Sequence, residues 1–334
     1  MSAVKEPATG TRGWGAPAEV GGAWSSSSGS NGAAADDADS SEANGHARRA
    51  AFAHDAAFWR KLARFGAARG PEWWVRYSPP FFGWAAALAV PSARRAVHQN
   101  LVRVRGRRGP VKDAIDVAKT FGTYAGCLAE VLSNGSKNQR LPGAILRGEH
   151  NVDAALAPGT GIVLVTAHTA GWEIVGPLLQ REHGREVVMV MAPEPDERAR
   201  RLQDEARLAI GLRVAHVGDP MAPLALLKEL RQGSIVALQI DRLPPGMKTR
   251  SVDLLGAPGA IPEGPLRLAA AAGAPIFPLF SARIGYREYL IDARPPIFVP
   301  RRPTERELDD VAQRLASELG RFLRAHPTQW FDFG

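Results

Sequence analysis

The sequence predicts an α/β protein whose largely parallel central sheet is flanked by helices. Short apolar runs alternate with helical stretches, which is the pattern of parallel strands joined by helical crossovers. The runs are GIVLVTA (161–167), EVVMVMA (186–192), LRVAHV (212–217) and SIVALQI (234–240). The clearest helical stretches between them are ERARRLQDEARLAIG and APLALLKELRQG. The 334 residues, 45% hydrophobic and 23% charged, suffice for one large domain or for a domain with an appendage.

Further elements are expected on both sides of this alternation. From Val111 the apolar residues recur at three- and four-residue steps, which predicts one amphipathic helix. The runs PIFPLFSARI and EYLIDARPPIFV are expected to be closing strands. The last helix should open at Thr304, with Glu307 completing a capping box, and run to about Ala325. In the helix expected from Val111, the apolar positions are Ile115, Ala118, Phe121, Ala125, Leu128 and Leu132.

Three regions follow from these patterns. Residues 1–50 are rich in Gly, Ser and Ala with a small acidic cluster at 36–42, and they show no apolar periodicity, so a disordered tail is expected. The tail lacks the charged start, apolar middle and cleavage site of a signal peptide, so export is not supported. Residues 51–112 form a basic, aromatic helical segment, and residues 113–334 the α/β domain.

The basic segment suits a membrane surface. The chain has a net charge of +8, and from Ala56 to Pro110 eleven Lys and Arg residues accompany a single acid, Glu72. The apolar run 81–90 is about half the ~20 residues that a bilayer-spanning helix requires, so it should not span. Aromatic pairs and arginines fit the headgroup layer, while the alternative is a helical subdomain packed on the core with a solvated basic face. These residues are Trp73, Trp74, Phe81, Phe82, Arg94, Arg95, Arg103, Arg105, Arg107 and Arg108.

The stretch VTAHTAGWEIVG (165–176) places a base and an acid just past a predicted strand. Strands of an open α/β sheet deliver functional groups at their carboxyl ends. His168 and Glu173 can meet only if His168 lies in the turn and Glu173 in the first turn of the following helix. A hydrogen bond from Glu173 would then fix the tautomer of His168 and leave its other ring nitrogen as a base, and backbone N–H groups of the helix terminus would stabilise an oxyanion. The alternative is a structural histidine at a strand end.

Other chemistries have little support in the sequence. The single cysteine, Cys127, excludes a disulfide framework and a cysteine-based zinc site. His183 and His216 have no acidic or Cys cluster at metal-ligand spacing, so no metal is assigned. There is no GxxxxGK[ST] loop, and GxSxG is absent from the α/β region. His326 is expected to end the last helix, where Pro327 stops it.

Several blocks, in order, carry a family resemblance. HTAGWE (168–173) resembles the HxGNWE form of the motif of the bacterial lipid A acyltransferase family, whose relatives include the acyltransferases of phosphatidylinositol mannosides. RRAVHQNLVRVRG and CLAEVL resemble the blocks before that motif. ARLAIG (206–211), the long stretch 239–278 and AHPTQWFDFG resemble those after it. The resemblance covers about residues 80–334 and implies a glycerolipid acyltransferase-like fold.

The departures from the family pattern indicate a divergent member. The family's Gly-Asn is Ala170-Gly171 here, and its Asp-Gln is Asp241-Arg242. Phe-Phe-Gly is replaced by Leu254-Leu255-Gly256, and the last Trp of the closing signature by Asp332. These changes weaken the inference that the acceptor is a lipid A precursor more than the inference that the reaction is acyl transfer.

The resemblance implies an acyltransferase that uses no cofactor. The donor would be a thioester on acyl carrier protein or coenzyme A, and the acceptor a hydroxyl or amine of a lipid or glycolipid such as a lipid A precursor. His168 would be the general base, Glu173 its orienting partner, and Arg207 and Asp241 would line the site. Arg242, Lys248 and Arg250 are added because a phosphate of donor or acceptor requires cations near the carboxyl edge of the sheet. The implied location is the cytoplasmic face of the inner membrane, peripheral or monotopic.

Two alternatives of other classes remain at this point. One is a catalytically silent membrane-surface protein on the same fold, motivated by the altered Gly-Asn. The other is a nucleic-acid binder, because the Arg-rich segment has interleaved aromatic residues. The second leaves the C-terminal motif series unexplained, so no nucleic acid is expected as a partner.

Overall fold

The structure is a computed structural model that describes residues 70–133, 142–192, 213–219, 221–243 and 246–334. All of these residues belong to one compact unit of the chain. The expectations for the tail 1–50, for the helix ERARRLQDEARLAIG and for Arg207 lie outside the described residues.

The described strands form a seven-stranded sheet in the order β1-β9-β8-β2-β5-β3-β4, together with a separate hairpin, β6–β7. The strands from β8 to β4 are parallel, while β9 runs antiparallel to β8 and carries β1 parallel to itself at the edge. A largely parallel sheet is therefore confirmed. The strands are β1 (Gly143–Arg147), β2 (Ile162–Thr166), β3 (Val187–Met191), β4 (Arg213–His216), β5 (Ile235–Gln239), β6 (Thr249–Leu254), β7 (Ala257–Pro262), β8 (Ile276–Gly285) and β9 (Glu288–Ala293).

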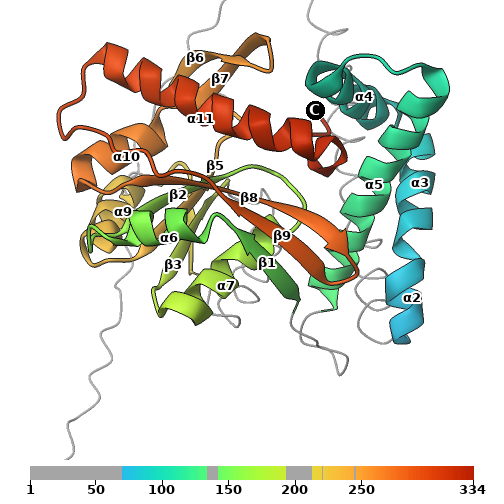
Figure 1. Cartoon of the computed structure of the whole chain (residues 1–334), viewed down its shortest axis with the longest axis horizontal. Helices are drawn as coiled ribbons and strands as arrows, with labels where there is room; N and C mark the ends of the chain where they lie inside the picture. Colours follow the sequence, from blue (N-terminus) through green and yellow to red (C-terminus); the bar gives the residue numbers. More distant parts are fainter. Residues whose placement is uncertain (1–69, 134–141, 193–212, 220, 244–245) are drawn as a thin grey trace, which may run out of the picture. The chain divides into compact units, whose positions relative to one another are not determined.

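Helices cover both faces of the sheet (Figure 1). On one face, α9 (Ala222–Arg231), α10 (Gly264–Ala272) and α11 (Glu305–Ala325) bury the larger apolar core, and on the other face α6 (Glu149–Leu156) and α7 (Trp172–His183) bury a smaller one. Successive side chains of a strand point to opposite faces, so Val163 and Val165 enter the larger core, whereas Ile162 and Leu164 enter the smaller. The expected helical flanks are confirmed.

Helices α2 (Glu72–Tyr77), α3 (Pro79–Ala89), α4 (Pro91–Arg105) and α5 (Pro110–Leu132) pack together beside the sheet. Close packing of α3 on α5 depends on Gly83, because a Cβ there would overlap the backbone carbonyl of Phe121. Within the described residues, α3 and α4 therefore pack against α5. Among the described helices, none combines the length and the apolar character needed to cross a bilayer.

The inward face of α5 differs from the predicted one. Ile115 and Leu128 were expected to be buried but are 49% and 39% exposed, and the buried face instead contains three carboxylates. Asp113 and Asp116 pair with Arg105, and Glu130 pairs with Arg283, so charges on this face are neutralised by partners from other elements. Apolar periodicity does not detect a face of this kind. The buried side chains are Asp113, Asp116, Val117, Thr120, Phe121, Cys127 and Glu130.

The last helix agrees with its signals. In α11, Thr304 accepts from the backbone N–H of Glu307, and the Glu307 carboxylate accepts from the backbone N–H of Thr304. The helix ends at Ala325 and the short helix η1 (Pro327–Gln329) follows, as the Pro at 327 requires. The expected capping box is confirmed.

Candidate active site

Strand register brings His168 and Asp241 together. β2 and β5 are parallel neighbours in which Thr166 lies opposite Gln239. His168 and Asp241 each come two residues after these paired positions, so both leave the carboxyl edge of the sheet side by side. The ladder continues one step further, because the backbone N–H of Ile240 donates to the carbonyl of Thr166 at 3.0 Å.

The two side chains form a hydrogen-bonded pair. His168 Nδ1 lies 2.9 Å from Asp241 Oδ1, and the backbone N–H of His168 donates to Asp241 Oδ2 at 3.0 Å. The Asp241 side chain is fully buried. Burial alone would raise the pKa of this carboxyl, but hydrogen bonds from His168 and Trp330 outweigh burial and hold the pKa below its usual range. A neutral imidazole that donates Nδ1–H to this carboxylate keeps its lone pair on Nε2.

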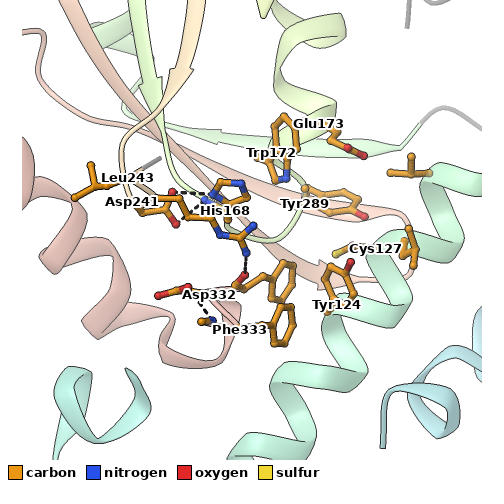
Figure 2. A pocket seen from close by; sticks show the side chains of 16 residues that line it. Tyr124, Cys127, His168, Trp172, Glu173, Asp241, Leu243, Tyr289, Asp332 and Phe333 are labelled. Atoms are coloured by element: carbon orange, nitrogen blue, oxygen red, sulfur yellow. Dashed lines mark hydrogen bonds and ion pairs between the residues drawn. The ribbon is translucent and has the colours of Figure 1, made fainter. Parts of the chain in front are cut away.

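Glu173 does not occupy the predicted position beside His168. α7 begins at Trp172, so Glu173 lies in its first turn as expected, but the ring nitrogen Nδ1 of His168 faces Asp241. Figure 2 shows the Glu173 carboxyl group beyond the Trp172 ring, away from the imidazole. The helix rotates Glu173 out of the turn that holds His168, whereas the register of β5 delivers Asp241 to it. The orienting contact predicted for Glu173 is therefore made by Asp241.

Residues 326–334, which follow α11, form a strap across the turn that contains His168. The backbone N–H of Phe331 donates to the carbonyl of His168 at 2.8 Å, and Ala170 donates to the carbonyl of Gln329 at 3.1 Å. These contacts pair Thr169 with Trp330 as an isolated antiparallel bridge. The backbone N–H groups of His168 and Ala170 already donate to acceptors within the protein. They therefore cannot take the role of oxyanion donors that was predicted for backbone N–H groups near this helix terminus.

A pocket of about 740 Å³ opens beside this pair. His168, Asp241 and Glu173 all line it, together with Tyr289 from β9. One wall is aromatic, since the Tyr124 ring lies 5.3 Å from Phe331 and 5.0 Å from Phe333 between ring centroids. A volume in this range is typical of small-molecule sites. From α5, the lining residues are Tyr124, Cys127, Leu128 and Val131.

A buried polar network supports the floor of the pocket. The Tyr289 hydroxyl donates to Glu130 Oε2, and Arg283 Nη2 donates to Glu130 Oε1 at 2.7 Å. The Tyr289 ring lies against Gly171, whose φ of +83° belongs to the left-handed region. Burial, with the charge of Glu130, raises the pKa of the neighbouring Cys127 thiol to about 12, so this side chain remains protonated at neutral pH.

The predicted phosphate-binding cations are dispersed. Arg242 lines the pocket, and its Nη2 donates to the carbonyl of Phe331 at 2.6 Å. Lys248 and Arg250 do not line this pocket, because the hairpin β6–β7 carries Arg250 to α11. Arg250 pairs there with Glu263, Glu305 and Asp309. Within the described residues, no group of three His, Cys, Asp or Glu side chains is arranged to hold a metal ion.

The residues that the sequence analysis missed lie in the strap and on β9. Tyr289 had no motif of its own, and Trp330 and Phe331 were noted only as members of the closing stretch AHPTQWFDFG. Trp330 is buried, and its indole N–H also donates to Asp241 Oδ2 at 2.9 Å. A useful signal was the resemblance of AHPTQWFDFG to a closing signature, which indicated importance without indicating a contact.

A largely parallel α/β sheet with a carboxylate–histidine pair at its carboxyl edge, beside a partly aromatic pocket, has the arrangement of an enzyme active site. The family model described as bacterial lipid A biosynthesis acyltransferase matches residues 48–333. The chain belongs to this family and is an enzyme that transfers acyl groups.

Two relatives give the scale of its divergence. The chain is 28% identical over 297 residues to the phosphatidylinositol mannoside acyltransferase of Mycobacterium tuberculosis (strain ATCC 25618 / H37Rv), covering 84% of this chain and 89% of that protein. It is 28% identical over 211 residues to the protein of the same name from Mycolicibacterium smegmatis (strain ATCC 700084 / mc(2)155), covering 59% of this chain and 66% of the relative.

Proposed function

We propose that the protein transfers a fatty acyl chain from a thioester, on acyl carrier protein or coenzyme A, to a hydroxyl or amine of a lipid or glycolipid, with His168 as general base. The observation that carries this proposal is the 2.9 Å contact between His168 Nδ1 and the buried Asp241 at the edge of the pocket. Asp241 orients the imidazole and stabilises the imidazolium that forms, so Nε2 is the proton acceptor.

The acyl group then passes directly from the donor to the acceptor. As His168 Nε2 removes the proton of the acceptor hydroxyl, the oxygen attacks the thioester carbonyl carbon. The new C–O bond forms and the C–S bond breaks. The imidazolium returns its proton to the leaving thiolate, which departs as a thiol. This step uses no covalent enzyme intermediate.

The pocket walls suggest where the substrates bind. We assign the acyl chain to the aromatic wall of Tyr124, Phe331 and Phe333. Among the described residues that line the pocket, Arg242 is the only Arg or Lys. We assign its side chain to a phosphate group of the donor or of the acceptor. Glu173 is assigned to the acceptor, as a carboxylate able to accept from its hydroxyl groups. The names of the relatives favour a sugar hydroxyl of a phosphate-bearing glycolipid, a class that includes lipid A precursors.

A thiol-release assay tests this function. Purified protein with palmitoyl-coenzyme A or palmitoyl acyl carrier protein should release thiol when a phosphate-bearing glycolipid is present. Mass spectrometry should show the acceptor heavier by one acyl chain. Thiol release that no acceptor increases, together with the absence of any acylated product, would contradict the proposed function. Equally efficient acylation of a glycolipid without phosphate would contradict the role of Arg242.

We further propose that α2 and α3 bind the cytoplasmic face of the inner membrane. We call their exposed large apolar side chains the aromatic patch, in which ring contacts join Trp73 to Trp74 and Trp74 to Phe82. Arg103 and Arg105 do not contribute to this surface, because Arg103 donates to carbonyls of the β6–β7 hairpin and Arg105 pairs with Asp116. The patch comprises Trp73, Trp74, Tyr77, Phe81, Phe82, Trp84 and Leu88.

Changing the patch should weaken membrane binding. Phe81 and Phe82 are 64% and 61% exposed, and replacing both by Ser removes apolar area that inserts at the interface. We expect the binding constant for vesicles containing anionic lipid, measured by sedimentation, to fall by roughly thirtyfold, since each of the two aromatic side chains contributes on the order of 1 kcal/mol. Leu224→Ser on α9, at a 61% exposed position, is the control and should sediment as the wild type does. Equal binding of all three proteins would contradict the role of the patch.

A further inference from the structure

Trp330 reaches the carboxylate of the His168–Asp241 pair from the strap. Two backbone hydrogen bonds, from Phe331 to His168 and from Ala170 to Gln329, fix the strap on the turn. They leave the Trp330 ring buried, 5% exposed, with its Nε1 2.9 Å from Asp241 Oδ2. The indole is a donor only, so this contact is a hydrogen bond from Trp330 to Asp241.

The hydrogen bonds on Asp241 divide between its two oxygens. Oδ2 accepts from the His168 backbone N–H and from the Trp330 indole, whereas Oδ1 faces His168 Nδ1. Rotation of the carboxylate about its Cβ–Cγ bond would break both bonds to Oδ2. The indole therefore helps to keep Oδ1 aimed at the imidazole.

The indole also compensates the burial of this charge. The Asp241 side chain has no solvent exposure, and a buried carboxylate requires hydrogen-bond donors to remain ionised. No Arg or Lys side chain among the described residues forms an ion pair with Asp241, so N–H donors from His168 and Trp330 provide this stabilisation.

We propose that Trp330 is a positioning residue for acyl transfer, which acts through Asp241 by holding the carboxylate in the orientation that aims His168. This inference rests on the proposed role of His168 and Asp241. Trp330 does not line the pocket, so its effect should fall on the reaction step and not on substrate binding.

The substitution Trp330→Phe tests the hydrogen bond, because Phe retains an aromatic ring and lacks the N–H. We expect kcat for thiol release to fall by roughly ten- to a hundredfold, which corresponds to the loss of one hydrogen bond to a charged group. KM for palmitoyl-coenzyme A and for the glycolipid should stay within about twofold of the wild-type values. Loss of packing without a positioning role would lower the amount of folded protein, not kcat per folded molecule.

A double-mutant cycle separates positioning from packing. In an Asp241→Asn background, Trp330→Phe should lower kcat by less than about twofold further, because the group through which it acts is already changed. Phe322→Leu is the control: its ring packs on Phe280 in the core, so its effect should be equal in both backgrounds. Wild-type kcat in Trp330→Phe, or an equal loss in both backgrounds, would overturn the inference. Failure of the proposed function itself is distinguishable, since His168→Ala would then release thiol at the wild-type rate.

Discussion

Replacing His168 by Ala should lower kcat/KM for acyl transfer by on the order of 10³-fold, which is the usual contribution of a general base. Most of this loss should appear in kcat, because the pocket walls that hold the acyl chain are unchanged. The fold should survive: the imidazole is 20% exposed, and Asp241 keeps the N–H donors of the His168 backbone and of Trp330. Thiol release at saturating donor and acceptor, with circular dichroism for folding, provides the measurement.

His183 offers a matched control for this substitution. It lies in the last turn of α7 and is exposed, and it does not line the pocket. His183→Ala should therefore retain wild-type kcat/KM. A His168→Ala enzyme that matches His183→Ala in rate would exclude the imidazole as the base.

Gly171→Ala should destabilise the fold and disrupt the site together. Gly171 is the N-cap of α7 with a φ of +83°, and a Cβ there would overlap the Cδ1 and Cε1 atoms of the Tyr289 ring. The ring cannot move freely, because Tyr289 is buried and its hydroxyl donates to Glu130. We expect the free energy of unfolding to fall by about 3 kcal/mol, combining left-handed backbone strain with overpacking.

The opposite end of the same helix provides the control. Gly184 is the C-cap of α7 with a φ of +64°, and a Cβ there meets nothing within 4 Å. Gly184→Ala should cost about 1 kcal/mol from backbone strain alone. Gly171→Ala should in addition lose roughly a hundredfold in kcat, because His168 lies three residues away and small displacements of a reacting group are costly. Denaturant unfolding and thiol release measure the two effects, and equal unfolding free energies for the two variants would contradict the steric argument.

The same geometry bears on the departure at Gly171. The family pattern has Asn at this position, and Asn and Gly are the residues that adopt left-handed backbone most readily. The exchange of one for the other therefore keeps the conformation of the turn. In this chain the space beside Gly171 is filled by Tyr289, so an Asn side chain would require the ring to shift.

Strand positions could be predicted from the sequence because the buried strands are short apolar runs. β2, β3, β4, β5, β8 and β9 coincide with such runs. β1 and the hairpin β6–β7 were not predicted: all five residues of β1 are exposed, and the hairpin turns through Leu255-Gly256, which carries positive φ without a recognised turn signal. These elements depend on contacts with distant segments, which local patterns do not contain.

The site shows the same division. The position of His168 at a strand end followed from the sequence, but the identity of its partner depended on strand order. Glu173 is near in sequence, whereas Asp241 is 73 residues away and becomes a neighbour only through the pairing of β2 with β5. The sequence analysis also placed Arg250 at the site. Its three acidic partners lie on other segments, and the sequence alone does not show that they are its neighbours.

The most direct test compares the two carboxylates in a single-turnover measurement of acyl transfer. Asp241→Asn and Glu173→Gln each remove one negative charge and preserve the shape of the side chain. If Asp241 aims His168, the Asp241→Asn rate constant should fall by on the order of 10² to 10³-fold, and that of Glu173→Gln by about tenfold or less. A larger loss in Glu173→Gln, with Asp241→Asn near the wild-type rate, would contradict the assignment of the catalytic pair.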